Sequence, residues 1–150
     1  MAYVDLNPIR AKMADSVETS EYTSAYERIH GVAQQQEKPS EYHFIKKPLF
    51  GFVGDTNEQQ TQGIPFSLLD YIELVDWSGR IIREDKRGVI SNQRPRLLST
   101  LGLDDDTWLS LASSFGKDYH GAVGSLEALA TYASNTGKRW IASKNQLQLH

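Results

Sequence analysis

The sequence contains no cysteine. A chain without cysteine forms no disulfide bond, has no thiol nucleophile and offers no thiolate ligand to a metal ion. Long apolar runs are also missing, since none approaches the roughly 20 apolar residues of a membrane-spanning helix. The segment from Met1 to Asp5 has neither the basic nor the apolar region of a signal peptide. These absences exclude thiol chemistry and favour a cytoplasmic protein that does not enter a membrane.

An excess of positive charge is missing as well. The 150 residues include 16 lysines and arginines against 19 aspartates and glutamates, which gives a net charge of −3. The overall charge therefore does not indicate a nucleic-acid partner, as a strongly basic chain would. Hydrophobic residues make up 39% of the chain, which is enough for a folded core. We expect one ordinary domain, or one domain with an extension.

The most regular pattern lies between Ile64 and Gly88, and it predicts one long amphipathic helix over about residues 67–87. Ser67 stands directly before the apolar run and is followed by Asp70 at the spacing of a helix-capping pair. Acidic side chains dominate the first half and basic ones the second, as the helix dipole favours. One face is formed by Leu68, Tyr71, Ile72, Leu74, Val75, Gly79, Ile81 and Ile82. The sequence therefore predicts a mainly α-helical fold in which shorter helices pack on this one.

Two parts are predicted along the chain. Residues 1–63 should contain the end of a helix, a second helix over 21–32 and an irregular linker, and residues 64–150 should form a compact helical C-terminal domain. Short strands are compatible with residues 41–53, where the apolar residues follow no dependable period. The predicted core consists of large apolar side chains: Phe66, Leu68, Tyr71, Ile72, Leu74, Val75, Ile82, Leu97, Leu98, Leu101, Trp108, Leu111, Phe115, Leu126 and Leu129.

The N-terminal segment reads Tyr3-Val4-Asp5-Leu6-Asn7-Pro8-Ile9-Arg10-Ala11. It resembles the region around the catalytic tyrosine of single-tyrosine HUH transposases, most closely the REP-associated tyrosine transposases and their insertion-sequence relatives. In that family a tyrosine, an apolar residue, two variable residues and Asn-Pro lie on and after the C-terminal helix of the nuclease fold. A later stretch resembles the C-terminal extension of larger members through Asp70-Tyr71, Asp76-Trp77, Gly79-Arg80 and residues 83–88. The resemblance thus touches both ends of residues 3–88.

The resemblance implies a role for Tyr3. In the family, the tyrosine hydroxyl attacks a DNA phosphodiester to form a 5′-phosphotyrosine, and a divalent metal held by a His–apolar–His pair polarises the phosphate. This chain has no two histidines two positions apart; they are His30, His43, His120 and His150. We therefore expect the HUH nuclease core to be lacking, Tyr3 to be the nucleophile by position but inactive, and the chain to hold no metal or cofactor. Without the resemblance, Tyr3 is an exposed aromatic residue near a frayed terminus.

Basic residues gather in and after the long helix, with a smaller pair near the C-terminus. They are Arg80, Arg83, Lys86, Arg87, Arg94 and Arg96, then Lys138 and Arg139. If these side chains converge, they form a patch that binds DNA phosphates. The alternative is a solvated helix end, in which Asp76 pairs with Arg80 one helical turn later and other acids dilute the positive field. Both interpretations remain open at the level of sequence.

By resemblance, we expect the C-terminal accessory or DNA-binding part of a transposase, truncated and without nuclease activity on its own. Its process would be DNA transposition and recombination of a mobile element, and its partner would be single-stranded or hairpin DNA. The alternative is a non-enzymatic helical module for protein interaction or homodimer formation. The sequence does not separate these functions, because helix faces used for packing and for partners carry the same residue types.

Overall fold

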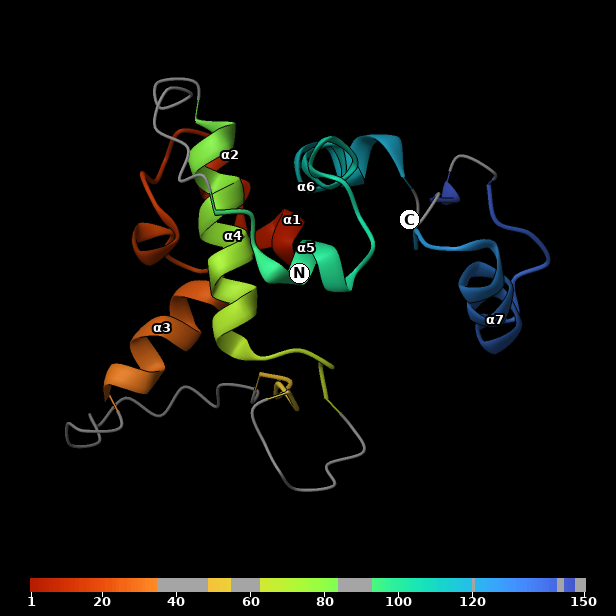
Figure 1. The fold of residues 1–150 in the computed structure, drawn as a ribbon, viewed down its shortest axis with the longest axis horizontal. Helices are drawn as coiled ribbons and strands as arrows, with labels where there is room; N and C mark the ends of the chain where they lie inside the picture. The colour runs from red at the N-terminus through yellow and green to blue at the C-terminus, as the bar shows by residue number, and fades with distance from the viewer. Residues whose placement is uncertain (35–48, 55–62, 84–92, 120, 143–144, 148–150) are drawn as a thin grey trace. The chain divides into compact units, whose positions relative to one another are not determined.

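Helices form the regular structure of the protein in a computed structural model (Figure 1). The structure describes residues 1–34, 49–54, 63–83, 93–119, 121–142 and 145–147. Within these ranges it contains α-helices, one 3-10 turn and no sheet, which confirms the predicted mainly helical fold. The elements are α1 (Ala2–Asp5), α2 (Asn7–Arg10), η1 (Val17–Thr19), α3 (Ser24–Gln34), α4 (Leu68–Ile82), α5 (Arg96–Thr100), α6 (Asp105–Asp118) and α7 (Leu126–Thr136). None of the described helices is both long enough and apolar enough to cross a lipid bilayer.

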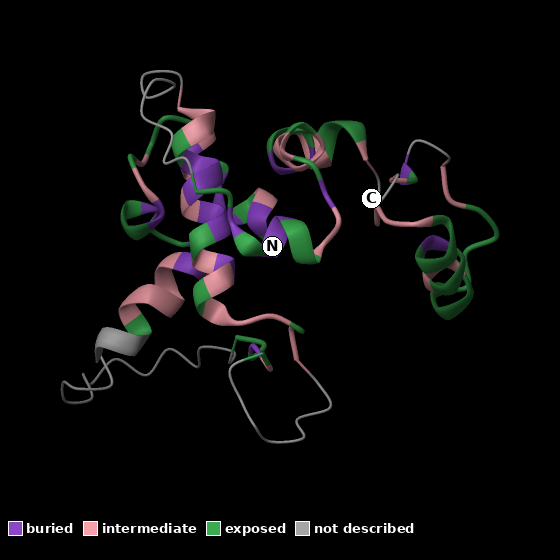
Figure 2. Ribbon diagram, viewed as in Figure 1, coloured by how far each residue is buried: buried purple, intermediate pink, exposed green. Residues whose placement is uncertain are grey.

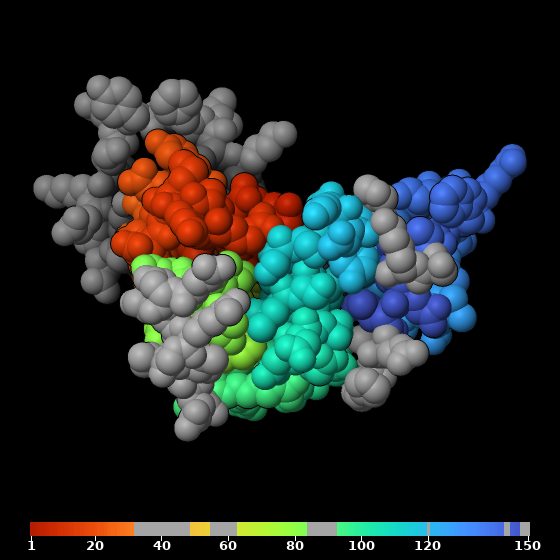
Figure 3. All heavy atoms as spheres, turned by 90° about the horizontal axis from the view of Figure 1, so that it is seen from above, coloured from red at the N-terminus to blue at the C-terminus, as the bar shows by residue number. Residues whose placement is uncertain are grey.

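The chain divides into two compact units, Met1–Leu97 and Leu98–His150. The long helix α4 belongs to the first unit, because α2 and η1 pack against it. Figure 3 shows the N-terminal residues, coloured red to orange, directly against this green helix. The division therefore does not follow the predicted boundary at residue 63, which would separate α4 from the N-terminal residues.

Helix α4 begins where the sequence predicts and ends earlier. The Ser67 hydroxyl oxygen accepts a hydrogen bond from the Asp70 backbone N–H at 3.0 Å, so the predicted N-cap is confirmed. The helix ends at Ile82 rather than at residue 87, because Arg83 takes an extended backbone conformation with ψ at 111°. The Arg83 guanidinium there donates to the backbone oxygen of Asp15 at 2.6 Å and pairs with its carboxylate at 2.8 Å. Residues 84–92 lie outside the described ranges.

A glycine lets residues 1–12, which we call the N-terminal corner, approach α4 closely. A Cβ atom on Gly79 would lie 2.8 Å from Cδ1 of Ile9 and 3.5 Å from Cδ2 of Leu6, so a larger side chain would have to displace the first of these. Leu6 and Ile9 are both buried. In Figure 2 the middle of α4 is the most continuous buried (purple) stretch in this unit. The N-terminal corner and α4 thus share one core.

The core matches the prediction in the helix centres and differs elsewhere. Buried predicted residues are Tyr71, Leu74, Val75, Leu97, Leu98, Leu111 and Leu129. The prediction is wrong for Leu126, which is 68% exposed at the first position of α7. Buried apolar residues outside the prediction are Ala2, Leu6, Ile9, Val17, Ala25, Phe52, Trp77, Leu103 and Ala112. Many of these stand singly in short turns, where no helical period marks them.

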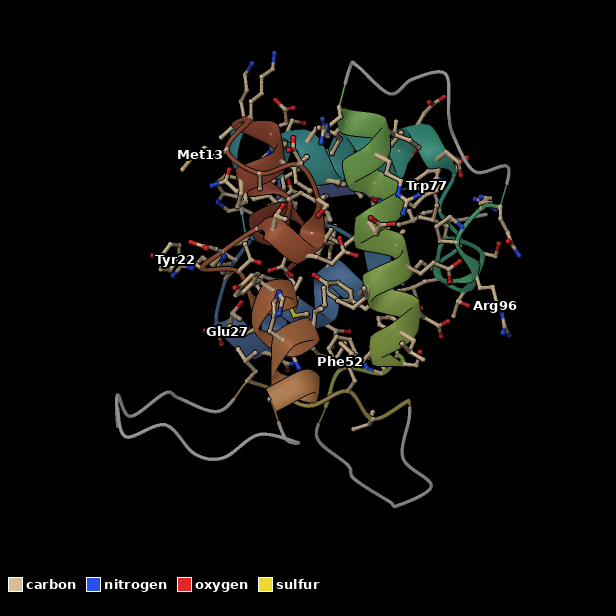
Figure 4. The ribbon with its side chains drawn as sticks, turned by 90° about the vertical axis from the view of Figure 1, so that its left-hand side faces the viewer. Met13, Tyr22, Glu27, Phe52, Trp77 and Arg96 are labelled. Carbon is tan, nitrogen blue, oxygen red and sulfur yellow. The ribbon has the colours of Figure 1, made fainter. Side chains whose placement is uncertain are left out.

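Short strands were predicted for residues 41–53. In the described part of this range, the structure contains one isolated parallel bridge, between Phe52 and Ile64. The Val53 N–H donates to the Ile64 oxygen at 2.9 Å. The ring of Phe52 lies 5.4 Å from the Tyr71 ring, and the guanidinium of Arg28 on α3 lies 4.8 Å from the Phe52 ring centre (Figure 4). Phe52 thus connects α3 with the N-terminal part of α4. Residues 41–48 lie outside the described ranges.

In the second unit, the chain after α7 folds back on the residues before it. Ser125 caps the start of α7, and Gly137, with φ at 66°, ends the helix in the left-handed conformation that glycine accommodates. Further on, the Gly124 N–H donates to the Asn145 oxygen at 3.1 Å, and the Leu147 N–H donates to the Gly124 oxygen at 2.9 Å. These bonds hold the residues that follow α7 beside its N-terminal end.

Candidate functional site

Tyr3 is packed against Arg10, another residue of its own motif. Its ring is half-buried on α1, with the guanidinium carbon of Arg10 at 3.9 Å from the ring centre. Arg10 also donates from Nη2 to the side-chain oxygen of Asn7 at 2.7 Å. A guanidinium over an aromatic face is an attractive contact. Tyr3 is therefore not an exposed aromatic residue at a frayed end, and Arg10 links it to the rest of the motif.

A buried carboxylate lies at the centre of the first unit. Asp5 is 1% exposed, and its Oδ1 accepts from the backbone N–H of Ser24 at 2.9 Å and of Ala25 at 3.3 Å. The Ser24 hydroxyl lies within hydrogen-bonding distance of both carboxylate oxygens, and Oδ2 also accepts from the hydroxyl of Tyr71. Asp5 thus caps the N-terminus of α3 from α1 and joins both helices to α4. We call Asp5, Ser24 and Tyr71 the buried polar cluster.

Tyr71 stays protonated in this cluster. Burial raises the pKa of its phenol, the nearby negative charge and hydrogen bond of Asp5 raise it further, and the positive charge of Arg28 opposes them only in part. The phenol therefore acts as a donor to the Asp5 carboxylate. This arrangement is structural, since neither group opens onto solvent.

The raised pKa of Tyr71 predicts a loss of stability at alkaline pH. An unfolded tyrosine loses its proton near pH 10, whereas folded Tyr71 retains it, so the contribution is complete below about pH 10 and declines above it. The Tyr71→Phe variant should show a shallower fall in unfolding free energy between about pH 9 and pH 11. Tyr22→Phe is the matched control, because Tyr22 is 96% exposed. Urea unfolding at each pH measures the effect, and equal slopes in all three proteins would contradict it.

Arg83 forms a cavity with two basic residues from the N-terminal corner. Arg10, Lys12 and Arg83 line a space of about 460 Å³, which has Asp15 as its acidic residue among the described lining. We call this space the basic cavity. A second space of about 310 Å³ lies beside it, where Arg80 and Arg83 face three acidic side chains: Asp15, Glu18 and Asp76. Of these two neighbouring spaces, only the basic cavity has more positive than negative side chains among its described lining residues.

The predicted basic residues that the structure describes in the first unit do not line one common cavity. Arg80 makes the predicted ion pair with Asp76 at 2.7 Å. Arg94 and Arg96 are exposed in the first unit and line neither cavity, and Figure 4 shows Arg96 projecting outward. Lys138 and Arg139 belong to the second unit. Lys86 and Arg87 lie outside the described residues.

Sequence reasoning missed Arg10 and Lys12. Both precede Arg83 by about 70 residues along the chain, and only the packing of α2 on α4 brings them to it. The available signal was their position in the sequence, since Arg10 lies inside the Tyr3–Ala11 segment and Lys12 follows it directly.

Among the described residues, no group of three or more histidine, aspartate or glutamate side chains is placed to hold a metal ion. His30, which lies in the described part of the chain, has Nε2 at 3.1 Å from the backbone oxygen of Glu18 and packs its ring on Tyr26.

Comparison of the chain with protein-family models, with curated proteins and with solved structures found no match. The function of the chain must therefore be inferred from its own residues.

Proposed function

We propose that the chain is the C-terminal accessory, DNA-binding part of a transposase and has no nuclease activity on its own. The observation that carries this proposal is the packing of the two segments that resemble the family. The segment containing Tyr3 and Arg10 lies against α4, which Arg83 follows directly, and Arg10 and Arg83 both contribute cations to the basic cavity. Residues that are distant in sequence thus supply one candidate site for phosphate.

The chemistry of the basic cavity suits a DNA backbone. Arginine and lysine are the cationic side chains that bind DNA phosphates, and arginine can bind two phosphate oxygens at once. Arg10 connects the cavity to Tyr3, since its guanidinium lies on that ring. A phosphate bound by Arg10 and Lys12 would therefore lie near the residue that corresponds to the family's nucleophile. In this proposal the site positions DNA.

The absence of nuclease activity is inferred from the sequence. The family mechanism uses two histidines separated by one apolar residue, and no such pair is present. A tyrosine hydroxyl is a weak nucleophile at neutral pH and requires activation. In this proposal Tyr3 lies beside the bound DNA strand and does not attack it.

Fluorescence anisotropy with labelled single-stranded, hairpin and duplex DNA at several salt concentrations tests the proposal. We expect the chain to bind the single-stranded and hairpin forms, with an affinity that falls steeply as salt rises, because phosphate binding releases counterions. Absence of binding at low salt would contradict DNA binding. The same oligonucleotides should remain intact with magnesium or manganese. Cleavage that Tyr3→Phe abolishes would contradict the second half of the proposal.

A further inference from the structure

An apolar groove lies between α7 and the residues that follow it. Leu126, Ala130 and Ala133 line it from α7, and Arg139 and Trp140 line it from the segment that runs back after the helix. The space measures about 220 Å³. We call it the α7 groove, and all of its lining lies within the second unit.

The returning segment is fixed at both of its ends. At the first end, the Lys138 N–H donates to the Ala133 oxygen at 2.9 Å, directly after the left-handed turn at Gly137. At the second end, Asn145 pairs with Gly124 through the backbone. Trp140 therefore lies on a segment that is anchored on both sides.

Trp140 is 78% exposed in spite of this anchoring. Leu126, on the opposite side of the groove, is 68% exposed. Single exposed apolar residues are ordinary, but these two large side chains border the same groove. An indole held at the rim of a groove presents a flat aromatic face to a ligand.

The described lining of the groove contains one charged residue, and its charge is positive. Arg139 lines it and makes no hydrogen bond or ion pair with another described residue. Lys138 is exposed beside it, with Nζ at 5.2 Å from the centre of the Tyr132 ring. No aspartate or glutamate occurs among the described lining residues. Glu127 lies on α7 next to Leu126 but does not line the groove. An occupant should therefore combine a flat apolar part with negative charge.

An unpaired nucleotide has this combination. Proteins that bind single strands place bases on exposed aromatic rings and phosphates near arginine and lysine. We propose that Trp140 is a stacking platform for one unpaired base of single-stranded DNA, and that Arg139 and Lys138 bind the adjacent phosphates. This inference rests on the proposed function and adds a second DNA site, separate from the basic cavity.

The experiment measures binding of the full chain to a thymine oligonucleotide and to an abasic oligonucleotide of equal length and charge. Trp140→Ala should weaken binding of the thymine strand at least about five-fold, the lower end of the stacking range, and should leave binding of the abasic strand unchanged. Trp140→Phe should retain part of the difference, because phenylalanine still stacks. Trp108→Phe is the control in the same unit. Because Trp140 is exposed, circular dichroism should show both Trp140 variants folded.

Several outcomes would overturn the inference. If Trp140→Ala binds both strands as the unchanged chain does, base stacking on Trp140 is wrong, while the proposed DNA-binding function stands. If both strands lose affinity equally, Trp140 has only a structural role. If the unchanged chain self-associates and Trp140→Ala is monomeric with unaltered DNA affinity, a second copy of the chain occupies the groove. If the unchanged chain binds no DNA at low salt, the inference and the proposed function fail together.

Discussion

Replacing Asp5 by alanine should lower the unfolding free energy of the first unit by at least about 3 kcal/mol. The buried carboxylate accepts from Tyr71, from the Ser24 hydroxyl and from the backbone N–H groups of Ser24 and Ala25. An alanine would leave these donors, which are buried or half-buried, without their acceptor. Each unsatisfied buried donor costs about 1–3 kcal/mol, and loss of a helix cap costs about 1 kcal/mol.

Hydrogen exchange is the suitable measurement, because it separates the two units of the chain. Peptides from α3 and α4 should lose protection in Asp5→Ala, and peptides from α6 should keep it. Glu21→Ala is the control, since Glu21 is an exposed acid in the same unit. Asp5→Asn should show a smaller loss, because its carbonyl oxygen still accepts while its amide group faces donors. Unchanged exchange in α3 and α4 would show that the buried polar cluster does not stabilise the unit.

The regular part of the fold was accessible from local sequence patterns. Ser67 and Asp70 mark the start of α4, and the spacing of Tyr71, Leu74 and Val75 marks its buried face. Capping and helical periodicity act within a few residues, so the sequence alone displays them. The end of α4 was not accessible in this way. At that end Arg83 contacts Asp15, which lies 68 positions away along the chain, and no local pattern marks such a contact.

The candidate sites depend on such distant contacts even more strongly. Asp5 and Tyr71 are 66 positions apart, and Arg10 and Lys12 meet Arg83 only because the N-terminal corner packs on Gly79. Clustering of basic residues along the sequence predicts only neighbours in sequence. It therefore predicted Arg94 and Arg96 as part of the phosphate-binding patch, and these residues line neither cavity.

Leu126 shows the opposite error. Its helical spacing from Leu129 is the spacing of a core residue, and it lies at the edge of the exposed α7 groove instead. Periodicity identifies an apolar face without saying whether the chain itself covers that face.

Removing the three cations of the basic cavity should have the largest effect on DNA binding. In the Arg10→Gln/Lys12→Gln/Arg83→Gln variant, the slope of log affinity against log salt for single-stranded DNA should become shallower by about 2, since each phosphate contact contributes about 0.7. The affinity at low salt should fall more than about ten-fold. Glutamine keeps the length and polarity of the side chains, so the loss reports their charge. Anisotropy titrations across a range of salt concentrations give both quantities.

In the triple variant, the effect of lost charge must be separated from that of lost packing, because Arg10 contacts Tyr3 and Arg83 forms an ion pair with Asp15. Lys12→Gln alone serves this purpose, since Lys12 is exposed and makes no ion pair with another described residue. It should make the slope shallower by about 0.7 and leave the urea midpoint unchanged. Lys117→Gln, an exposed lysine on α6, is the matched control and should behave as the unchanged chain. If the triple variant stays folded and keeps the full salt slope, the DNA contacts lie elsewhere. The second unit, with Lys138 and Arg139, is then the part of the chain in which to look for them.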